Sequence, residues 1–245
     1  TIQANAYGII AASESERRRD VFSGHIDLKF NIIKGLTFTS SNGVDYYNNT
    51  SYSFTPQSVN GAGKNSMGNS NLQRMLLQSS NNITYNHTWN DKHYLTVTGV
   101  WEATKSTIRN MGISGSSLQA ESVGWWDVKN AVTRDATNGY SDWALLSGVG
   151  RVIYNYDNRY MLTGTFRADG SSRFTNDKWG YFPSVAVAWT ASNESFMEST
   201  RDLISNLKIR ASYGVIGNQD IDPYSTLAIL NTTTTYFGNS SGVTG

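Results

Sequence analysis

The stretch "FSGHIDLKFNI" at positions 22–32 alternates apolar and polar residues without a break. A period of two places successive side chains on opposite sides of an extended chain, so the stretch predicts a β-strand with one apolar and one polar face. After "IKG" at 33–35, Leu36 and Phe38 resume the apolar parity, and Gly35 suits the left-handed residue of a three-residue hairpin loop. The stretch and its continuation therefore predict a β-hairpin.

The same pattern recurs along the chain. Alternating segments flank the turns "TWNDK" at 88–92 and "DNR" at 157–159, and others begin at Val185 and Leu207. We count about eight strands of roughly 9–13 residues, which is long beside the usual 5–6 of soluble proteins. Short turns alternate with long polar loops at 47–71, 103–142 and 168–180, and residues 191–206 carry a short helical pattern.

Alternation of short and long connections is typical of a transmembrane β-barrel with short periplasmic turns and long extracellular loops. Aromatic residues gather near both ends of the predicted strands, as expected for girdles at two membrane interfaces. The short-turn group is Trp89, Tyr94, Tyr154, Tyr156, Tyr160 and Trp189, and the long-loop group is Tyr46, Trp101, Trp143, Phe166 and Phe182. The predicted fold is all-β: an antiparallel transmembrane barrel, of which this chain supplies a part. A soluble β-sandwich remains the alternative, because it also has one apolar face per strand.

Composition removes several classes of function. The formal net charge of +1 favours no nucleic acid partner, and the absence of cysteine excludes disulfide scaffolds, thiolate zinc sites and cysteine nucleophiles. No run of 18 apolar residues predicts a transmembrane helix. Thr1 opens a mixed segment that does not resemble a signal peptide, so we expect an internal piece of a longer protein.

The residues that could carry chemistry form no recognisable site. His87 and His93 flank one turn, but no carboxylate cluster completes a metal site. "NGAGKNS" at 60–66 lacks the glycine spacing and the Ser or Thr of a phosphate loop. Neither a nucleophile elbow nor an assignable carboxylate pair is present, so we expect no enzyme, no catalytic residue, no metal and no cofactor.

Exposed aromatic residues in the longest predicted loop form one candidate ligand site. Trp125, Trp126 and Asp127 lie there, and indole rings can stack on sugars while a carboxylate binds hydroxyl groups. The alternative is that these tryptophans pack the loop onto itself.

Three motifs near the end of the chain resemble the barrel of SusC-like (SusC/RagA family) TonB-dependent receptors of Bacteroidota. They read "GRVIYNYDNRYMLTGTFRADGSSRF" at 150–174, "KWGYFPSVAVAW" at 178–189 and "LKIRASYGVIGNQDI" at 207–221. The strongest match covers 143–218, and the rest of 1–245 fits more loosely. The resemblance implies a barrel of roughly 22 strands with a plugged lumen in the outer membrane.

The resemblance also implies function and partners. Such receptors import glycans or peptides with a SusD-like lipoprotein as lid and TonB as energy source, and outer-membrane lipids surround the barrel. We see no plug domain, TonB box or closing C-terminal strand in 1–245 and expect that this piece does not fold or transport alone. The rival functions are a soluble secreted carbohydrate-binding module and a passive porin or adhesin barrel.

The motif "RADGSSRF" has an expected structural role. Asp169 and Gly170 are predicted to turn the chain in a loop from Ala168 to Gly180. The residues expected to contact neighbouring strands or the plug are Arg167, Asp169, Gly170, Ser171, Ser172, Arg173 and Phe174. Alternation predicts Leu28, Leu162 and Ile209 toward lipid and Lys29, Thr163 and Arg210 toward the lumen.

Overall fold

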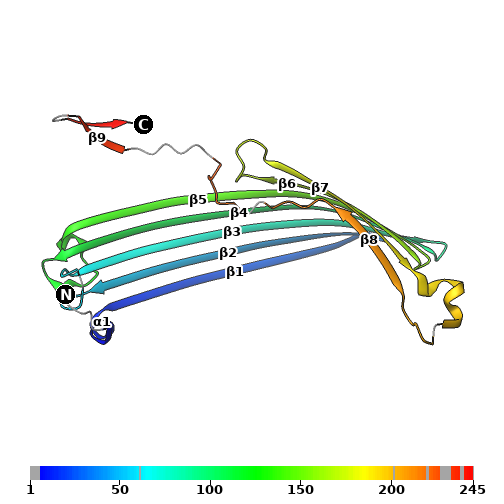
Figure 1. The fold of residues 1–245 in the computed structure, drawn as a ribbon, viewed down its shortest axis with the longest axis horizontal. Helices are drawn as coiled ribbons and strands as arrows, with labels where there is room; N and C mark the ends of the chain where they lie inside the picture. Colours follow the sequence, from blue (N-terminus) through cyan, green and yellow to red (C-terminus); the bar gives the residue numbers. More distant parts are fainter. Residues whose placement is uncertain are drawn as a thin grey trace.

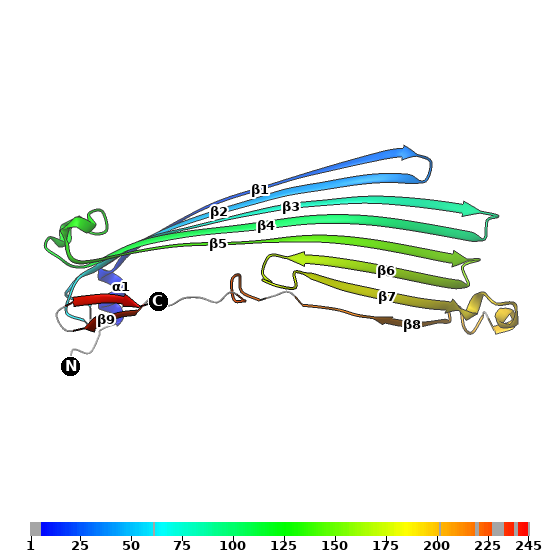
Figure 2. The same ribbon diagram turned by 90° about the horizontal axis from the view of Figure 1, so that it is seen from above.

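A computed structural model describes residues 6–60, 62–200, 202–218, 221–226, 233–237 and 240–244. Eight strands form one antiparallel sheet in which neighbours in sequence are neighbours in space. Figure 1 shows these strands as a single curved layer, and Figure 2 shows the same sheet from above. The strands are β1 Glu14–Ile33, β2 Leu36–Thr55, β3 Ser66–Trp89, β4 His93–Leu118, β5 Ala131–Tyr156, β6 Tyr160–Ser171, β7 Trp179–Thr190 and β8 Lys208–Gly214.

Short elements occupy the connections. Helix α1 (Ala6–Ala12) precedes β1, and the 3-10 helices η1 (Glu121–Val123) and η2 (Val128–Asn130) lie between β4 and β5. The expected helical segment after β7 consists of η3 (Ala191–Asn193) and η4 (Ser195–Thr200). Strands β9 (Thr233–Phe237) and β10 (Ser240–Thr244) pair with each other. None of the described helices has the length and apolarity needed to cross a bilayer.

The strands near the N-terminus are about twice as long as expected. β4 and β5 have 26 residues each, which at about 3.3 Å per residue is roughly 85 Å, whereas about 9–11 tilted residues cross a bilayer. The predicted loops 47–71 and 103–142 are therefore mostly strand, and the true connections are 56–65 and 119–130. These strands continue far beyond the part that can lie in lipid.

Polar cross-strand contacts explain why alternation missed these extensions. Asn71 Nδ2 donates to Asn48 Oδ1 at 2.8 Å and to Thr50 Oγ1 at 2.9 Å. Asn, Ser and Thr occupy both faces here, so the apolar period disappears while the backbone ladder continues without a shift in register between β2 and β3. A strand that is wet on both sides has no apolar stripe to reveal it.

The tight turns lie where they were expected. Gly35 has a φ of +84°, and a side chain there would meet the carbonyl oxygen of Asn86. A bulge near Asn31 pairs Ile33 with Leu36, so the first loop is one residue shorter than predicted. Tyr156 pairs with Tyr160 across the turn 157–159, as predicted.

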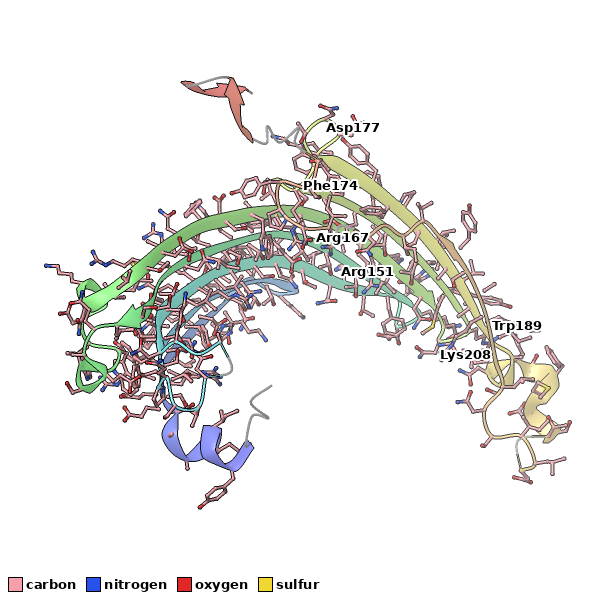
Figure 3. The ribbon with its side chains drawn as sticks, turned by 60° about the vertical axis from the view of Figure 1, so that its left-hand side comes forward. Arg151, Arg167, Phe174, Asp177, Trp189 and Lys208 are labelled. Carbon is pink, nitrogen blue, oxygen red and sulfur yellow. The ribbon has the colours of Figure 1, made fainter. Side chains whose placement is uncertain are left out.

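The register divides the side chains into two faces. The outer face carries Leu28, Leu162 and Ile209, and the inner face carries Lys29, Thr163 and Arg210, as the alternation predicted. Figure 3 shows Arg151, Arg167 and Lys208 on the concave side of the sheet and Trp189 on the convex side. The inner, polar face is therefore the concave one.

Large apolar side chains of the outer face are exposed. Ile26 is 63% exposed, Leu162 49% and Ile209 54%. A soluble sandwich would cover such a face with a second sheet, whereas the only other sheet in the described ranges has two short strands. A convex apolar face and a concave polar face match the wall of a membrane barrel.

Candidate functional site

A row of polar residues crosses the inner face at one height. Its members are strand partners in succession from β1 to β6: Asp27, Ser41, Ser80, Glu102, Ser147 and Asp169. We call these residues the inner row. Ser80 donates to a Glu102 carboxylate oxygen at 3.1 Å, and Ser41 donates to Asp27. Backbone pairing therefore runs through all six strands of the row, and side-chain hydrogen bonds add links between β1 and β2 and between β3 and β4.

Arg167 lies two residues before Asp169 on β6, on the same inner face, and its side chain contacts the inner row. Its Nε donates to Asp169 Oδ2 at 2.8 Å, and its NH2 donates to Ser147 Oγ at 3.2 Å. The same nitrogen lies 3.8 Å from Glu102 Oε2. Ser147 is only 2% exposed, so this guanidinium satisfies a buried hydroxyl and connects β4, β5 and β6.

Beside this network the inner face is hollowed. A depression of about 280 Å³ is lined by His25, Ser41, Gly43, Gln78, Ser79, Ser80, Glu102, Thr104, Leu145 and Ser147. His25 Nε2 lies 2.9 Å from Asp27 Oδ1 at one margin, and Glu102 lies at the other. Hydroxyl, amide and carboxylate groups here can hydrogen-bond a polar partner in the lumen.

Two motif residues expected in a turn lie in a strand instead. Asp169 and Gly170 pair with Gly180 and Trp179, and β6 runs through Ser171. Arg167, Asp169, Gly170 and Ser171 therefore do not form a loop, and the connection is 172–178. Pairing with both β5 and β7 decides this, because it satisfies backbone groups that a turn at Asp169 would leave open.

The serines of the motif close the end of the ladder. Ser172 donates its N–H to the Ala144 carbonyl at 2.9 Å, and its hydroxyl accepts the Ala144 N–H at 2.8 Å. The Ser171 N–H donates to the Lys178 carbonyl at 2.9 Å, and its hydroxyl accepts the Arg173 N–H. Ser172 is thus bonded to β5, whereas the two Ser171 bonds lie within the β6–β7 connection.

The remaining motif residues belong to the β6–β7 loop. The Arg173 guanidinium lies 4.6 Å from the centre of the Trp143 ring, and Thr226 donates to the Arg173 carbonyl at 2.9 Å. Phe174 donates its N–H to the Ser171 carbonyl. Figure 3 shows Phe174 and Asp177 in this loop on the convex side of the sheet.

In the other two motifs an aromatic ring packs over glycines. The Phe182 ring lies where side chains at Gly180 and Gly217 would be, with ring atoms 2.6 Å and 2.3 Å from the two β-carbon positions. "WGYFPS" and "YGVIGN" are therefore parts of one packing unit between β7 and the segment after β8. Packing of the Phe182 ring explains their spacing.

The loop tryptophans have different environments. Trp125 is half-buried, packs against the cluster of Phe54, Met67 and Leu118, and stacks on Tyr52 with ring centres 6.1 Å apart. Trp126 is 73% exposed, and the Asp127 carboxylate caps η2 by accepting the Lys129 N–H.

Strand parity shows on which face of the sheet this aromatic cluster lies. Tyr52 has the parity of the outer face, so the loop folds over that side of the sheet. Packing thus accounts for Trp125, capping accounts for Asp127, and ligand binding at Trp126 stays a prediction.

Two of the three histidines, His87 and His93, form part of an aromatic series. The rings of His87 and Trp89 lie 5.6 Å apart, those of Trp89 and His93 5.0 Å, and His93 Nδ1 lies 2.7 Å from the Tyr154 hydroxyl. Among the described residues no three His, Asp or Glu side chains gather as metal ligands.

Curated proteins resemble the chain over most of its length, although no family model matches it. TonB-dependent receptor P3 of Formosa agariphila is 32% identical over 228 residues, which cover 91% of this chain and 23% of that protein. TonB-dependent receptor P39 of the same organism is 34% identical over 80% of this chain and 19% of its own length. TonB-dependent receptor SusC of Bacteroides thetaiotaomicron is 45% identical over 78 residues, 31% of this chain and 8% of that protein.

The chain belongs to the SusC-like TonB-dependent receptors of the outer membrane. It spans about a fifth to a quarter of the length of the first curated relatives it matches. The solved structure of the RagAB peptide transporter has the same fold, with a TM-score of 0.84 and 21% identity over 96% of this chain and 26% of that one. The RagAB peptide importer in its "open-open" state matches equally well, with a TM-score of 0.83, 22% identity and the same coverage.

The receptor's outer face has an aromatic belt at the end of the sheet where the short turns lie. We call this the lower belt, and the opposite end of the sheet is the upper end. Along one row of strand partners lie Trp89, His93, Tyr156, Tyr160, Trp189 and Ile209, of which the first five carry aromatic rings. The first four flank the short turns 90–92 and 157–159, and Trp189 precedes the longer connection that begins at Ala191. This confirms the expected short-turn girdle except at Tyr94, whose parity is that of the inner face.

The upper belt differs from the expected one. Tyr46 lies near the upper limit of the outer apolar band, but Trp101 and Phe166 lie well inside it. Trp143 and Phe182 have inner-face parity. The strands extend beyond the band, so closeness to a predicted loop did not mean closeness to the interface.

The sequence did not point to Glu194, which lies between η3 and η4 and contacts residues of the lower belt. Its carboxylate accepts the Tyr160 hydroxyl at 2.7 Å and the Trp189 indole N–H at 3.0 Å, and it faces Arg159 at 3.3 Å. These hydrogen bonds and the Arg159 charge lower the pKa of Glu194. The only signal in the sequence was the long connection that interrupts the series of short turns.

Proposed function

We propose that this chain is part of the barrel of an energised importer for molecules too large for a passive pore. The observation that carries the proposal is the single curved sheet, apolar on its convex face and polar on its concave face. A wall of this kind encloses a wide, wet lumen. The inner row and the hollow beside it supply hydrogen-bonding groups along that wall.

The energy source and the lid are part of the proposal. As in SusC-like receptors, the complete protein is proposed to take energy from TonB and to carry a SusD-like lipoprotein on its extracellular side. Arg167 and the inner row would then face the plug domain, and Trp126, which lies over the outer side of the rim, would meet substrate only before it enters the lumen. The substrate is a glycan or a peptide; the solved relatives are named as peptide transporters.

Uptake measurements test the import function. A host strain lacking the full-length receptor gene is grown on defined oligosaccharides or peptides as sole carbon source, with and without the gene restored. We expect growth on one substrate class to require the receptor and to disappear when TonB is deleted. Receptor-dependent uptake that survives loss of TonB would indicate a passive porin instead.

Detergent dependence tests the membrane location independently. The full-length receptor should pellet with outer membranes and leave them only in detergent, because its outer face is apolar. Recovery as a detergent-free soluble monomer would support the rival binding module.

A further inference from the structure

A wide hollow lies on the outer face. It has a volume of about 650 Å³ and lies where the shorter pair β6–β7 ends beside the longer strands β3–β5. Its lining residues of outer-face parity are Asn42, Leu77, Ser79, Ala103, Lys105, Ala144, Leu146, Gly170, Ser172 and Trp179. We call this hollow the outer groove.

Small residues create the outer groove. Ala103 and Ala144 leave space between the larger side chains of Leu77, Leu146 and Trp179. The resulting wall is mostly apolar, and a volume of about 650 Å³ can hold part of a hydrocarbon chain.

The outer groove lies at the upper edge of the apolar band. Val44, Leu77, Lys105 and Ala144 are strand partners in one row, and two rows above it Arg109 pairs with Gln73 and Tyr140. Residues below Lys105 on the outer face of β4 are mostly apolar, the next two above it, Thr107 and Arg109, are polar, and Met111 and Ile113 follow farther up. The groove therefore spans the boundary between acyl chains and headgroups in the outer leaflet.

The charge in the groove has one sign. Lys105 and Lys178 line it, and none of its described lining residues is acidic. Asp142, diagonal to Lys105 on β5, accepts a hydrogen bond from the Tyr224 hydroxyl at 2.6 Å. An ammonium group at the edge of hydrocarbon is costly without a counter-charge.

We propose that the outer groove binds a phosphorylated glycolipid of the outer leaflet. One acyl chain lies along Leu77, Ala103 and Leu146 under the Trp179 ring, and the phosphate contacts the Lys105 ammonium. A basic group beside an apolar channel matches an anionic headgroup joined to a hydrocarbon chain. The groove lies on the face opposite the polar inner wall, so the inference does not depend on the substrate.

A second groove supplies an internal comparison. It has about 470 Å³ near the lower belt and is lined by Tyr154, Tyr160, Met161, Leu162, Val187, Ala188, Trp189, Ile209 and Ala211. None of these described lining residues is charged. This groove should take acyl chains without a preference for phosphate.

Native mass spectrometry of the detergent-solubilised full-length receptor tests the proposal. The added probes are the phosphorylated glycolipid extracted from the host outer membrane, the same lipid after phosphatase treatment, and an anionic glycerophospholipid. Wild-type receptor should retain the phosphorylated glycolipid best. Lys105→Gln should weaken that retention about five-fold, as expected for loss of one basic residue near a charged membrane surface.

Matched variants separate the groove from general charge. Lys105→Arg should retain the lipid, and Lys34→Gln, which removes the same charge from the β1–β2 turn, should not change retention. Ala103→Phe should block retention by filling the groove while leaving both lysines in place. Equal retention by wild type and Lys105→Gln, or equal retention of the three probes, would overturn the proposal.

Discussion

The Trp179 ring covers Gly170, its strand partner on β6. Three ring carbons lie 3.0 Å from the position that a Gly170 β-carbon would occupy. An aromatic ring over a cross-strand glycine stabilises a strand pair that would otherwise have a gap. The contact explains why two motifs separated in the sequence, "ADGSS" and "KWGYF", belong together.

Gly170→Val should destabilise the β6–β7 pair, because the branched side chain displaces the Trp179 ring. The expected cost is about 1–3 kcal/mol, typical of overpacking. The midpoint of heat-induced loss of the compact electrophoretic form of the full-length receptor measures it. Gly148→Val is the matched control, since nothing lies within 4 Å of a β-carbon there, and an equal effect of both changes would contradict the assignment.

Leu162→Arg should destabilise the barrel, whereas Thr163→Arg should be tolerated. The first change places a charge in lipid, at about 2–4 kcal/mol near the midplane, and the second places it in the wet lumen. Folding yield in outer membranes and unfolding midpoints in detergent would show the difference. Similar losses for the two variants would show that the faces are wrongly assigned.

Arg167→Ala should loosen the inner row by roughly 1 kcal/mol, a modest value because the guanidinium is partly exposed. Asp169→Asn should remove much of the same interaction, so the double variant should lose less stability than the two single variants summed. Unfolding midpoints of the four proteins measure the coupling. Strict additivity would mean that the 2.8 Å contact between Arg167 and Asp169 contributes nothing.

Glu194 should make stability depend on pH. Its pKa is lowered from the ordinary 4.5 by hydrogen bonds from Tyr160 and Trp189. The folded state thus binds the proton more weakly than the unfolded state, so the stabilisation is fully present above pH 4.5 and disappears as pH falls through the lowered value. The advantage of wild type over Glu194→Gln in unfolding midpoint should shrink on acidification, and a constant difference would refute this.

The isolated polypeptide 1–245 should not form a soluble monomer. In the described part of the chain, β1 and β8 are the two outermost strands of the sheet, and each is paired along one edge and unpaired along the other. Unpaired strand edges beside an exposed apolar face lead to association between molecules. Size-exclusion chromatography with thermal unfolding of the refolded polypeptide tests this. A monodisperse monomer with a sharp transition would contradict the expectation.

The two-faced strands were predictable wherever one face meets lipid. Residues 22–32 alternate because the β-strand period is two, and this local geometry also predicted the lipid-facing Leu162 and the lumen-facing Thr163. The motif around Asp169 pointed to the receptor family, although its placement in a turn was wrong.

Sequence alone thus determined the strand type, the two faces and the family, since each depends on short-range pattern. The tertiary structure decided how far β2 to β5 continue, because strands with polar residues on both faces carry no apolar period. It also decided that Arg167 meets Glu102, that Trp179 covers Gly170 and that Lys105 lies in a groove. These contacts depend on the register between strands, which is set by pairing of residues far apart in the chain.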